Sequence, residues 1–310
     1  MNPNSREIRL DAGEQVFFDE QLALVKSRTY DVKHKALKAL MLLPVSTEQD
    51  GGADKIIWRS YDQVGMAKIV ADYANDFPRA DIAGEEHITP VKDLGASYAY
   101  SLKEIRRAQK AGVSLDVKRA EAARRSIDEL QDKIAWFGNA KAKLPGFINA
   151  QGISEYVAAN NAGGTSKRWA DKTADEIVAD FAGLITAASE ATNGIENPDT
   201  VILPLALYNK LMTTPYGSNR DKTIMGFIRE NYPQITRIDW VSDLAGAGAG
   251  STNRVMAYSR DPLKVEVQIP QRFEQFPPQQ TGLVYDIICS QSTGGTIVYY
   301  PLSVVFCDGL

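Results

Sequence analysis

The sequence predicts a mixed α+β fold, with one long helix between an extended β-region and a C-terminal α/β region. Three observations lead to this fold class. Residues 101–149 carry a helical apolar pattern, residues 54–92 are rich in β-branched and aromatic residues, and residues 150–310 alternate between short helices and strands. The chain has 310 residues, of which 44% are hydrophobic and 24% charged. These proportions are typical of a folded globular protein.

Residues 1–50 are predicted to form an N-terminal arm with little core of its own. An apolar run at 36–43 is ended by Pro44. The arm also carries a cluster of basic residues, namely Lys26, Arg28, Lys33, Lys35 and Lys38. Nucleic acid is one possible partner of this cluster, but a solvated face or an acidic neighbour is the preferred interpretation.

The next segment is predicted to be a long hairpin. Residues 55–61 read as a strand, a turn-prone middle follows at Asp76-Phe-Pro78, and residues 87–91 read as a second extended piece. Pro90 suits an edge strand because it has no backbone N–H to donate. The apolar content is too low for an independent domain, so we expect the partner surface of this hairpin to lie elsewhere.

Residues 101–149 read as a long amphipathic helix that stops in the segment 138–149. From Ala120 onward its inward positions are spaced by three and four residues, at Ala120, Ala123, Ile127, Leu130, Ile134 and Phe137. Ser114 is expected to cap the helix and Gly138 to end it. From 115 to 137, at about 1.5 Å per residue, the helix would be roughly 35 Å long.

After residue 149 the pattern is mixed. Thr173 and Glu176 predict a capping box, Pro204 a helix start, and Asp221 the cap of another short helix. The expected strands are 200–203, 234–241, 254–259, 263–269, 283–290 and 296–306, the last two flanking the Gly294-Gly295 turn. In the fourth of these strands, Leu263, Val265, Val267 and Ile269 alternate as a half-buried strand requires.

No common catalytic, cofactor or metal motif is found. The two histidines, His34 and His87, lie far from the predicted globular part, and Cys289 and Cys307 sit in apolar runs that favour buried, unpaired thiols. The glycine-rich loop 246–250 precedes a predicted strand, whereas a dinucleotide site needs a helix there. We therefore predict no catalytic, cofactor-binding or metal-binding residues, although the many carboxylates leave a hydrolase open.

Charge and hydropathy exclude further classes. The formal net charge of −4 argues against a dedicated nucleic-acid or anionic-membrane binder. No apolar run reaches 18 residues, and the N-terminus lacks the apolar core of a signal peptide, so we expect a soluble protein made in the cytoplasm.

The order of these parts resembles a tailed-bacteriophage major capsid protein with the Hong Kong phage-type fold, which encapsulin shells share. More narrowly, the chain resembles the encapsulating-protein-like major capsid group. The resemblance covers essentially the whole chain. It rests on residues 59–68, Asp76-Phe-Pro78, residues 98–105, Pro145-Gly-Phe-Ile-Asn149, and the ending 299–310.

The resemblance implies a division of the chain into five parts. These are an N-terminal arm (1–50), an E-loop that reaches over a neighbouring subunit (51–96), a peripheral domain with the spine helix (97–154), an axial domain (155–290, some of whose central strands belong to the peripheral domain), and a C-terminal strand returning to the peripheral domain (291–310). The expected intersubunit contacts are Trp58, Arg59, Tyr61, Phe77, Pro78 and Arg79. The expected spine-helix core is Ala123, Ile127, Leu130, Ile134 and Phe137.

The function implied is a non-enzymatic shell protein of a virion, assembled in the bacterial cytoplasm. It would form pentamers and hexamers around double-stranded DNA bound without sequence specificity. Because the chain begins directly at the arm, we expect a separate scaffolding protein, together with a portal and possibly a decoration protein. Two alternatives remain: an encapsulin-type compartment that packages a cargo enzyme, and an α+β enzyme that binds a small molecule. Particle content separates the first from the capsid, and a compact small oligomer with a deep pocket would indicate the second.

Overall fold

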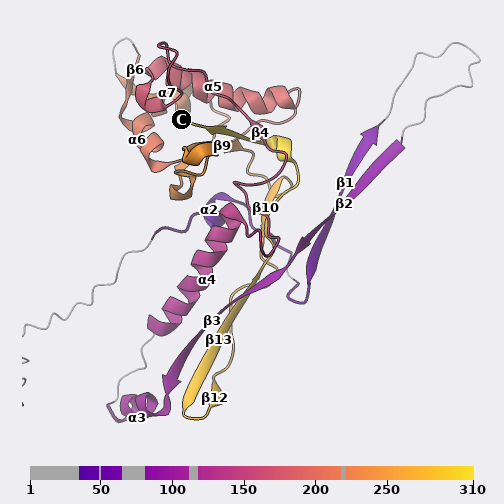
Figure 1. Ribbon diagram of the computed structural model, residues 1–310, viewed down its shortest axis with the longest axis vertical. Coiled ribbons are helices and arrows are strands. Elements are labelled where there is room, and N and C mark those ends of the chain that lie inside the picture. The colour runs from indigo at the N-terminus through magenta and orange to yellow at the C-terminus, as the bar shows by residue number, and fades with distance from the viewer. Residues whose placement is uncertain (1–34, 49, 65–80, 112–117, 218–220) are drawn as a thin grey trace, which may run out of the picture. The chain divides into compact units, whose positions relative to one another are not determined.

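Two β-sheets of different construction organise the chain (Figure 1). One is a mixed five-stranded sheet and the other is built on a long antiparallel ladder. The computed structural model describes residues 35–48, 50–64, 81–111, 118–217 and 221–310. Within it, Leu37–Leu310 form one compact unit.

The longest helices are α4 and α5. The described α-helices are α2 (Ala39–Leu42), α3 (Leu102–Ala111), α4 (Lys118–Phe137), α5 (Ala174–Ala191), α6 (Leu205–Thr213) and α7 (Ile224–Asn231). The described 3₁₀ helices are η1 (Trp169–Asp171), η2 (Ser242–Leu244), η3 (Ala249–Ser251) and η4 (Pro301–Ser303). None of the helices in the described ranges is both long and apolar enough to span a membrane.

The strands range from two to ten residues. They are β1 (Lys55–Val64), β2 (Asp81–Pro90), β3 (Lys92–Ser101), β4 (Ser154–Glu155), β5 (Thr200–Leu203), β6 (Pro215–Tyr216), β7 (Lys222–Thr223), β8 (Arg237–Trp240), β9 (Arg254–Tyr258), β10 (Val265–Gln268), β11 (Glu274–Gln275), β12 (Gln279–Thr281), β13 (Val284–Thr293), β14 (Gly295–Val298) and β15 (Val304–Asp308).

The five-stranded sheet is buried on both faces. Its strand order is β4–β15–β9–β5–β8, with β5 parallel to β8 and antiparallel to β9. Because side chains alternate along a strand, Val201 and Leu203 of β5 point to one face and Ile202 to the other. All three are fully buried. The sheet is therefore a central layer with a core on each side.

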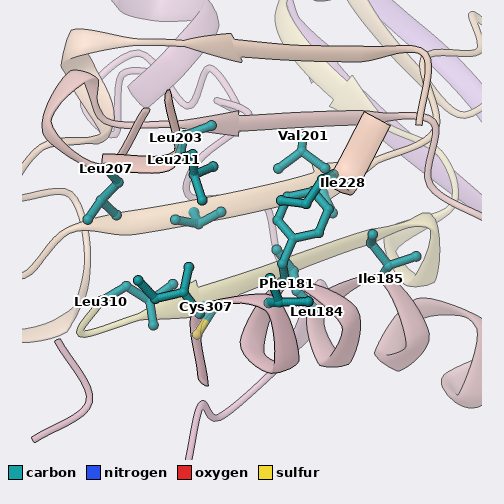
Figure 2. Close-up of a cluster of buried hydrophobic side chains, with 14 of the residues drawn as sticks. Phe181, Leu184, Ile185, Val201, Leu203, Leu207, Leu211, Ile228, Cys307 and Leu310 are labelled. Atoms are coloured by element: carbon teal, nitrogen blue, oxygen red, sulfur yellow. The ribbon is translucent and has the colours of Figure 1, made fainter. Parts of the chain in front are cut away.

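The first core lies between this sheet and helices α5, α6 and α7 (Figure 2). Phe181, Leu184 and Ile185 of α5 face Val201 of β5 and Cys307 of β15 there. The predicted capping box starts α5, since the side chain of Thr173 accepts the N–H of Glu176 and the Glu176 carboxylate accepts the N–H of Thr173. That prediction is confirmed.

The second core covers the opposite face of the sheet. Ile202 and Tyr258 pack there against Trp136 at the end of α4, against Phe147, and against α2. The phenol of Tyr258 donates to the carbonyl of Leu42 at 2.9 Å, which ties α2 to the sheet. This core joins the end of the long helix to the α/β region.

The third core lies between α4 and the long ladder. β3 and β13 pair antiparallel over ten residues (Figure 1). The short strands β11 and β12 pair with the other edge of β13. Leu94 and Cys289 of the ladder pack on Ala123, Ile127 and Ile134 of α4. Both cysteines of the chain, Cys289 here and Cys307 in the first core, are buried free thiols.

The predicted helical span 101–149 begins one residue later than expected, at Leu102, because Ser101 is the last residue of β3 and pairs with β13. A capping box between Ser101 and Glu104 starts α3 there. Within the predicted span the structure describes α3 and α4, and residues 112–117 between them lie outside the described residues. The predicted cap at Ser114 lies outside the described residues, whereas the predicted end is confirmed: α4 ends at Phe137 and Gly138 has a φ of 66°.

The buried face of α4 also differs at one predicted core position. Ala123, Ile127 and Ile134 are buried and Phe137 is half-buried, but Leu130 is 43% exposed. The expectation that Leu130 belongs to the core is therefore wrong for the single chain. The cause is α2, whose Ala39 N–H donates to the buried Asp132 carboxylate at 2.8 Å. Contact with α2 extends the buried arc toward Gln131 and Asp132 and leaves Leu130 at its edge.

Three further expectations are corrected. The cap of α7 is Thr223, whose hydroxyl accepts the N–H of Gly226 at 3.2 Å, and not Asp221. Leu263 is 76% exposed because it precedes β10, in which Val265 and Val267 are buried. The predicted strand 296–306 is two strands, because Pro301 begins η4 between them. As a result β14 pairs with β10 and β15 enters the five-stranded sheet.

Candidate functional site

The β1–β2 hairpin carries the predicted contact residues that the structure describes. The two strands pair antiparallel from Lys55↔Pro90 to Val64↔Asp81, which confirms the predicted hairpin. Trp58, Arg59 and Tyr61 all lie on β1. Phe77, Pro78 and Arg79, which were also predicted to make contacts, lie outside the described residues.

One face of the hairpin is anchored to its own chain. The ring of Trp58 stacks on the imidazole of His87 with centroids 3.9 Å apart and packs edge-on against Tyr299 at 5.1 Å. The hydroxyl of Ser60 lies 3.1 Å from Nε2 of His87, and Thr89 on the same face is buried. Trp58 therefore fixes the direction of the hairpin, a role that its predicted place among the contact residues did not include.

The opposite face of the hairpin carries exposed apolar side chains. Ile57 and Ile88 are direct cross-strand partners and are 46% and 58% exposed. Two residues further along each strand, Arg59 and Glu86 form an exposed ion pair at 3.2 Å. An apolar pair beside an ion pair is the composition of a protein contact, with a desolvated centre and a polar rim.

The outer edges of the hairpin are open as well. β1 and β2 form a two-stranded sheet, and no other described strand pairs with either of them. Each strand therefore presents unpaired backbone N–H and C=O groups along its outer edge. Such edges are templates for pairing with another chain.

A cleft of about 620 Å³ separates the anchored face from the end of α4. Its lining combines aromatic, apolar and amide side chains, including Trp58, His87, Lys143, Pro145, Asn149 and Val298.

The segment 138–149 that forms the floor of this cleft is held by the end of α4. The last turn of a helix leaves carbonyl groups without partners. Here the N–H of Phe147 donates to the carbonyl of Ala135 at 3.0 Å, and the N–H of Ile148 donates to that of Trp136 at 2.8 Å. The side-chain amide of Asn149 donates to the carbonyl of Phe137 at 3.2 Å. The segment is therefore a fixed part of the helix end.

Gly146 makes this arrangement possible. A Cβ atom at Gly146 would overlap the backbone of Phe137 and Gly138. The carbonyl of Pro145 accepts the N–H of Thr296 at 2.9 Å, which ties the same segment to β14. The glycine is thus required by a close backbone crossing.

A second exposed apolar area lies beside η4. Ile195, Tyr300 and Leu302 are 78%, 59% and 48% exposed and line one groove of about 580 Å³. Large apolar side chains gathered in this way mark an interaction surface more often than a ligand site.

The most deeply buried ion pair among the described residues lies in the interior, away from solvent. Lys172 and Asp180 form a buried ion pair at 2.5 Å, and the indole of Trp169 donates to the same carboxylate at 2.9 Å. The two charged side chains are 1% and 3% exposed, so no substrate reaches them. Among the described residues no three His, Cys, Asp or Glu side chains are grouped in a way that would hold a metal ion.

Sequence reasoning missed the apolar pair Ile57 and Ile88. Residues 56 and 57 are both isoleucine, and the sequence does not say which of them faces solvent. The register answers this, because Ile56 pairs with the buried Thr89 and Ile57 with the exposed Ile88. The presence of an isoleucine on each predicted strand was the only feature of the sequence that could have indicated this apolar pair.

The chain is similar to known capsid proteins. A family model described as "Major capsid protein" matches residues 65–310. The capsid of Myoviridae phage XM1 has a TM-score of 0.79 and 20% identity, over 94% of this chain and 98% of that one. The capsid of a native GTA particle has a TM-score of 0.65 and 10% identity, over 96% and 99%. A virus-like particle from Pyrococcus furiosus has a TM-score of 0.54 and 16% identity, over 87% and 91%. Comparison with curated protein sequences yields no significant match.

Proposed function

The chain belongs to the major capsid protein family, and we propose that it builds the icosahedral shell that encloses the double-stranded DNA genome of a tailed phage or prophage. The family and the Hong Kong phage-type fold make it a shell-forming structural protein. The finer statement concerns the contents of the shell and the way its subunits meet.

The exposed hairpin is the observation that best supports this proposal. An isolated two-stranded hairpin is marginally stable in water, because its contacts hardly offset the entropy lost on ordering it. This hairpin has an anchored face, an opposite face carrying the exposed Ile57 and Ile88, and two open edges. A closed shell of identical subunits would supply a neighbouring surface to every copy.

We propose the same five-part division of the chain that the resemblance implied. Residues 1–50 are the arm, 51–96 the loop that reaches over a neighbour, 97–154 the peripheral domain, 155–290 the axial domain, and 291–310 the returning strand. The strand β3 starts within the second part and leads the chain from the hairpin back to the long ladder.

For the contact residues, the proposal gives different roles to the two faces of the hairpin. Arg59, Ile57 and Ile88 touch the neighbouring subunit, and Trp58 orients the hairpin from its own chain. Tyr61, Phe77, Pro78 and Arg79 are proposed as further contacts.

The proposed partners are the other subunits of the shell, the proteins that help to assemble it, and the DNA inside it. The subunits form pentamers and hexamers in the cytoplasm of a bacterial host, with a separate scaffolding protein and a portal, and a decoration protein is a further candidate partner. Packaged DNA is contacted without sequence specificity. None of these contacts requires catalysis, so we propose no enzymatic activity.

Negative-stain electron microscopy tests the proposal. The purified chain is imaged alone and after co-expression with neighbouring genes. Angular hollow particles, or rings of five and six subunits, are expected. Dispersed small oligomers in both samples would contradict a shell. Nuclease-protected DNA within the particles supports a virion, whereas a packaged protein cargo would favour the encapsulin-type alternative.

A pair of hairpin variants tests the contact itself. In Ile57→Asp/Ile88→Asp the two carboxylates lie on a half-exposed face and repel each other across the strands, which weakens the hairpin but touches none of the three cores, so the rest of the chain should stay folded by circular dichroism while shells fail to form. The control Ile57→Val/Ile88→Val keeps the surface apolar and should assemble. Normal particles from the aspartate variant would show that this face makes no contact in the shell.

A further inference from the structure

We propose that α3 and the tyrosine-lined groove beside it bind an acidic protein segment that carries apolar side chains. The surface consists of four cations on α3 and a groove against the β3–β13 ladder. It lies apart from the hairpin face discussed above.

The cations of α3 share one face of the helix. Lys103, Arg106, Arg107 and Lys110 follow one another at the spacing i, i+3, i+4 and i+7, which places their side chains on neighbouring turns. All four are exposed, and within the described residues none of them forms an ion pair. Like charges at this spacing repel one another and destabilise the helix. A partner that brings negative charge would relieve that repulsion.

The single carboxylate of α3 does not neutralise this face. Glu104 accepts the N–H of Ser101 at 2.9 Å and pairs with Arg119 at 3.0 Å. Hydrogen bonds from Arg119 and Ser101 lower the pKa of Glu104 to about 2, so the group stays ionised and engaged. The charge of the exposed face is therefore uniformly positive.

The groove lies beside the cationic face of α3. It has a volume of about 540 Å³ and is lined mainly by aromatic and aliphatic side chains: Tyr98, Tyr100, Leu102, Ile105, Arg106, Gln275, Pro278, Tyr285 and Ile287. Arg106 belongs both to the lining and to the cationic face. One ligand can therefore contact the charges and the groove together.

The four cations and the apolar groove together indicate which class of partner would bind. Carboxylates of an acidic segment would pair with the four cations, and an apolar side chain of the same segment would enter the groove. A DNA duplex would also neutralise the cations, but its backbone has no apolar group to fill a groove lined by Ile105 and three tyrosines. The observations therefore favour an acidic, amphipathic protein segment.

Fluorescence anisotropy on the full-length, unassembled chain tests this proposal separately from shell formation. The probe is a fluorescein-labelled 18-residue peptide of glutamate and leucine with its leucines on one helical face. The comparison ligands are the scrambled peptide and an 18-base-pair DNA duplex. The amphipathic peptide is expected to bind at least about tenfold more tightly than the scrambled one.

Three variants separate charge from groove. Arg106→Glu/Arg107→Glu should weaken binding of the acidic peptide at least about tenfold and should gain affinity for a lysine–leucine peptide of the same pattern. Ile105→Ser should weaken binding of the amphipathic peptide and leave binding of the duplex unchanged. Lys141→Glu, an exposed cation elsewhere on the chain, should leave both affinities unchanged.

Each other outcome overturns the proposal. Tighter binding of the duplex, with no effect of Ile105→Ser, would make the surface a nucleic-acid contact. Equal binding of the scrambled peptide would mean that charge alone is recognised. Absence of binding to any ligand would leave α3 without a partner of this class. The gain of affinity for the lysine–leucine peptide keeps the test decisive if Ile105→Ser folds poorly.

Discussion

Truncation to alanine should lower the unfolding free energy much more at Ile127 than at Leu130, although both residues lie on α4 and have side chains of the same size. Ile127 is 2% exposed and packs in the third core, whereas Leu130, three residues later, is 43% exposed. Each alanine substitution removes three carbon atoms. For Ile127→Ala the lost transfer free energy is about 2.4 kcal/mol, at about 0.8 per carbon. The cavity left behind adds about 1 kcal/mol, so unfolding should become easier by about 3–4 kcal/mol. For Leu130→Ala no closed cavity forms, and about 1 kcal/mol is expected.

Urea unfolding followed by circular dichroism measures both values on the unassembled full-length chain. The slope of unfolding free energy against urea should be the same for the two variants, so that the midpoints report stability. Equal destabilisation by the two substitutions would refute the assigned rotation of α4. A Leu130→Ala chain that unfolds normally but assembles poorly would place Leu130 in an intersubunit contact.

Further predictions concern single features of the fold. Gly146→Ala should destabilise the chain by about 3 kcal/mol in the same urea assay, because the new methyl group would overlap the backbone of Phe137. Burial opposes ionisation of Asp308, but hydrogen bonds from Arg254 and a backbone N–H outweigh it and lower the pKa of Asp308. The stabilisation by this ionised carboxylate should therefore be complete above about pH 5 and be lost as the pH falls through and below the usual range of an aspartate pKa. Asp308→Asn should remove this contribution to the pH dependence of the unfolding free energy in acid titrations. Thr173→Ala should lower the unfolding free energy by about 1 kcal/mol, and an unchanged thermal midpoint would contradict the role of its capping box.

Features set by neighbouring residues were predictable from the sequence. The capping box at Thr173 and the end of α4 at Gly138 depend on side chains and backbone preferences within a few residues. The antiparallel hairpin was predicted from two successive β-rich segments of the chain. The Hong Kong phage-type fold followed from the order of such parts along the chain. The exposed face of the hairpin did not follow, because Ile56 and Ile57 have the same chemistry and differ only in register.

Features set by distant residues were not predictable. Nothing near Tyr98 indicates that β13, much later in the chain, pairs with this segment, so the sequence did not predict the strand β3. Gln131 and Asp132 lie outside the predicted apolar stripe, yet both are buried, and the Asp132 carboxylate accepts the N–H of Ala39 in α2. In the candidate site, the anchoring of Trp58 depends on Tyr299, which lies near the other end of the chain.

The long ladder also determines when a subunit becomes able to assemble. Asp93 and Ser292, which hydrogen-bond across it, are 199 residues apart in sequence. At about 5–20 residues per second, a ribosome needs roughly 10–40 s to reach the second strand after finishing the first. Cys307 and Leu310 complete the first core later still. A polypeptide released before residue 284 therefore lacks β13, on which the third core is built. We expect such truncated copies not to reach the fold that assembles.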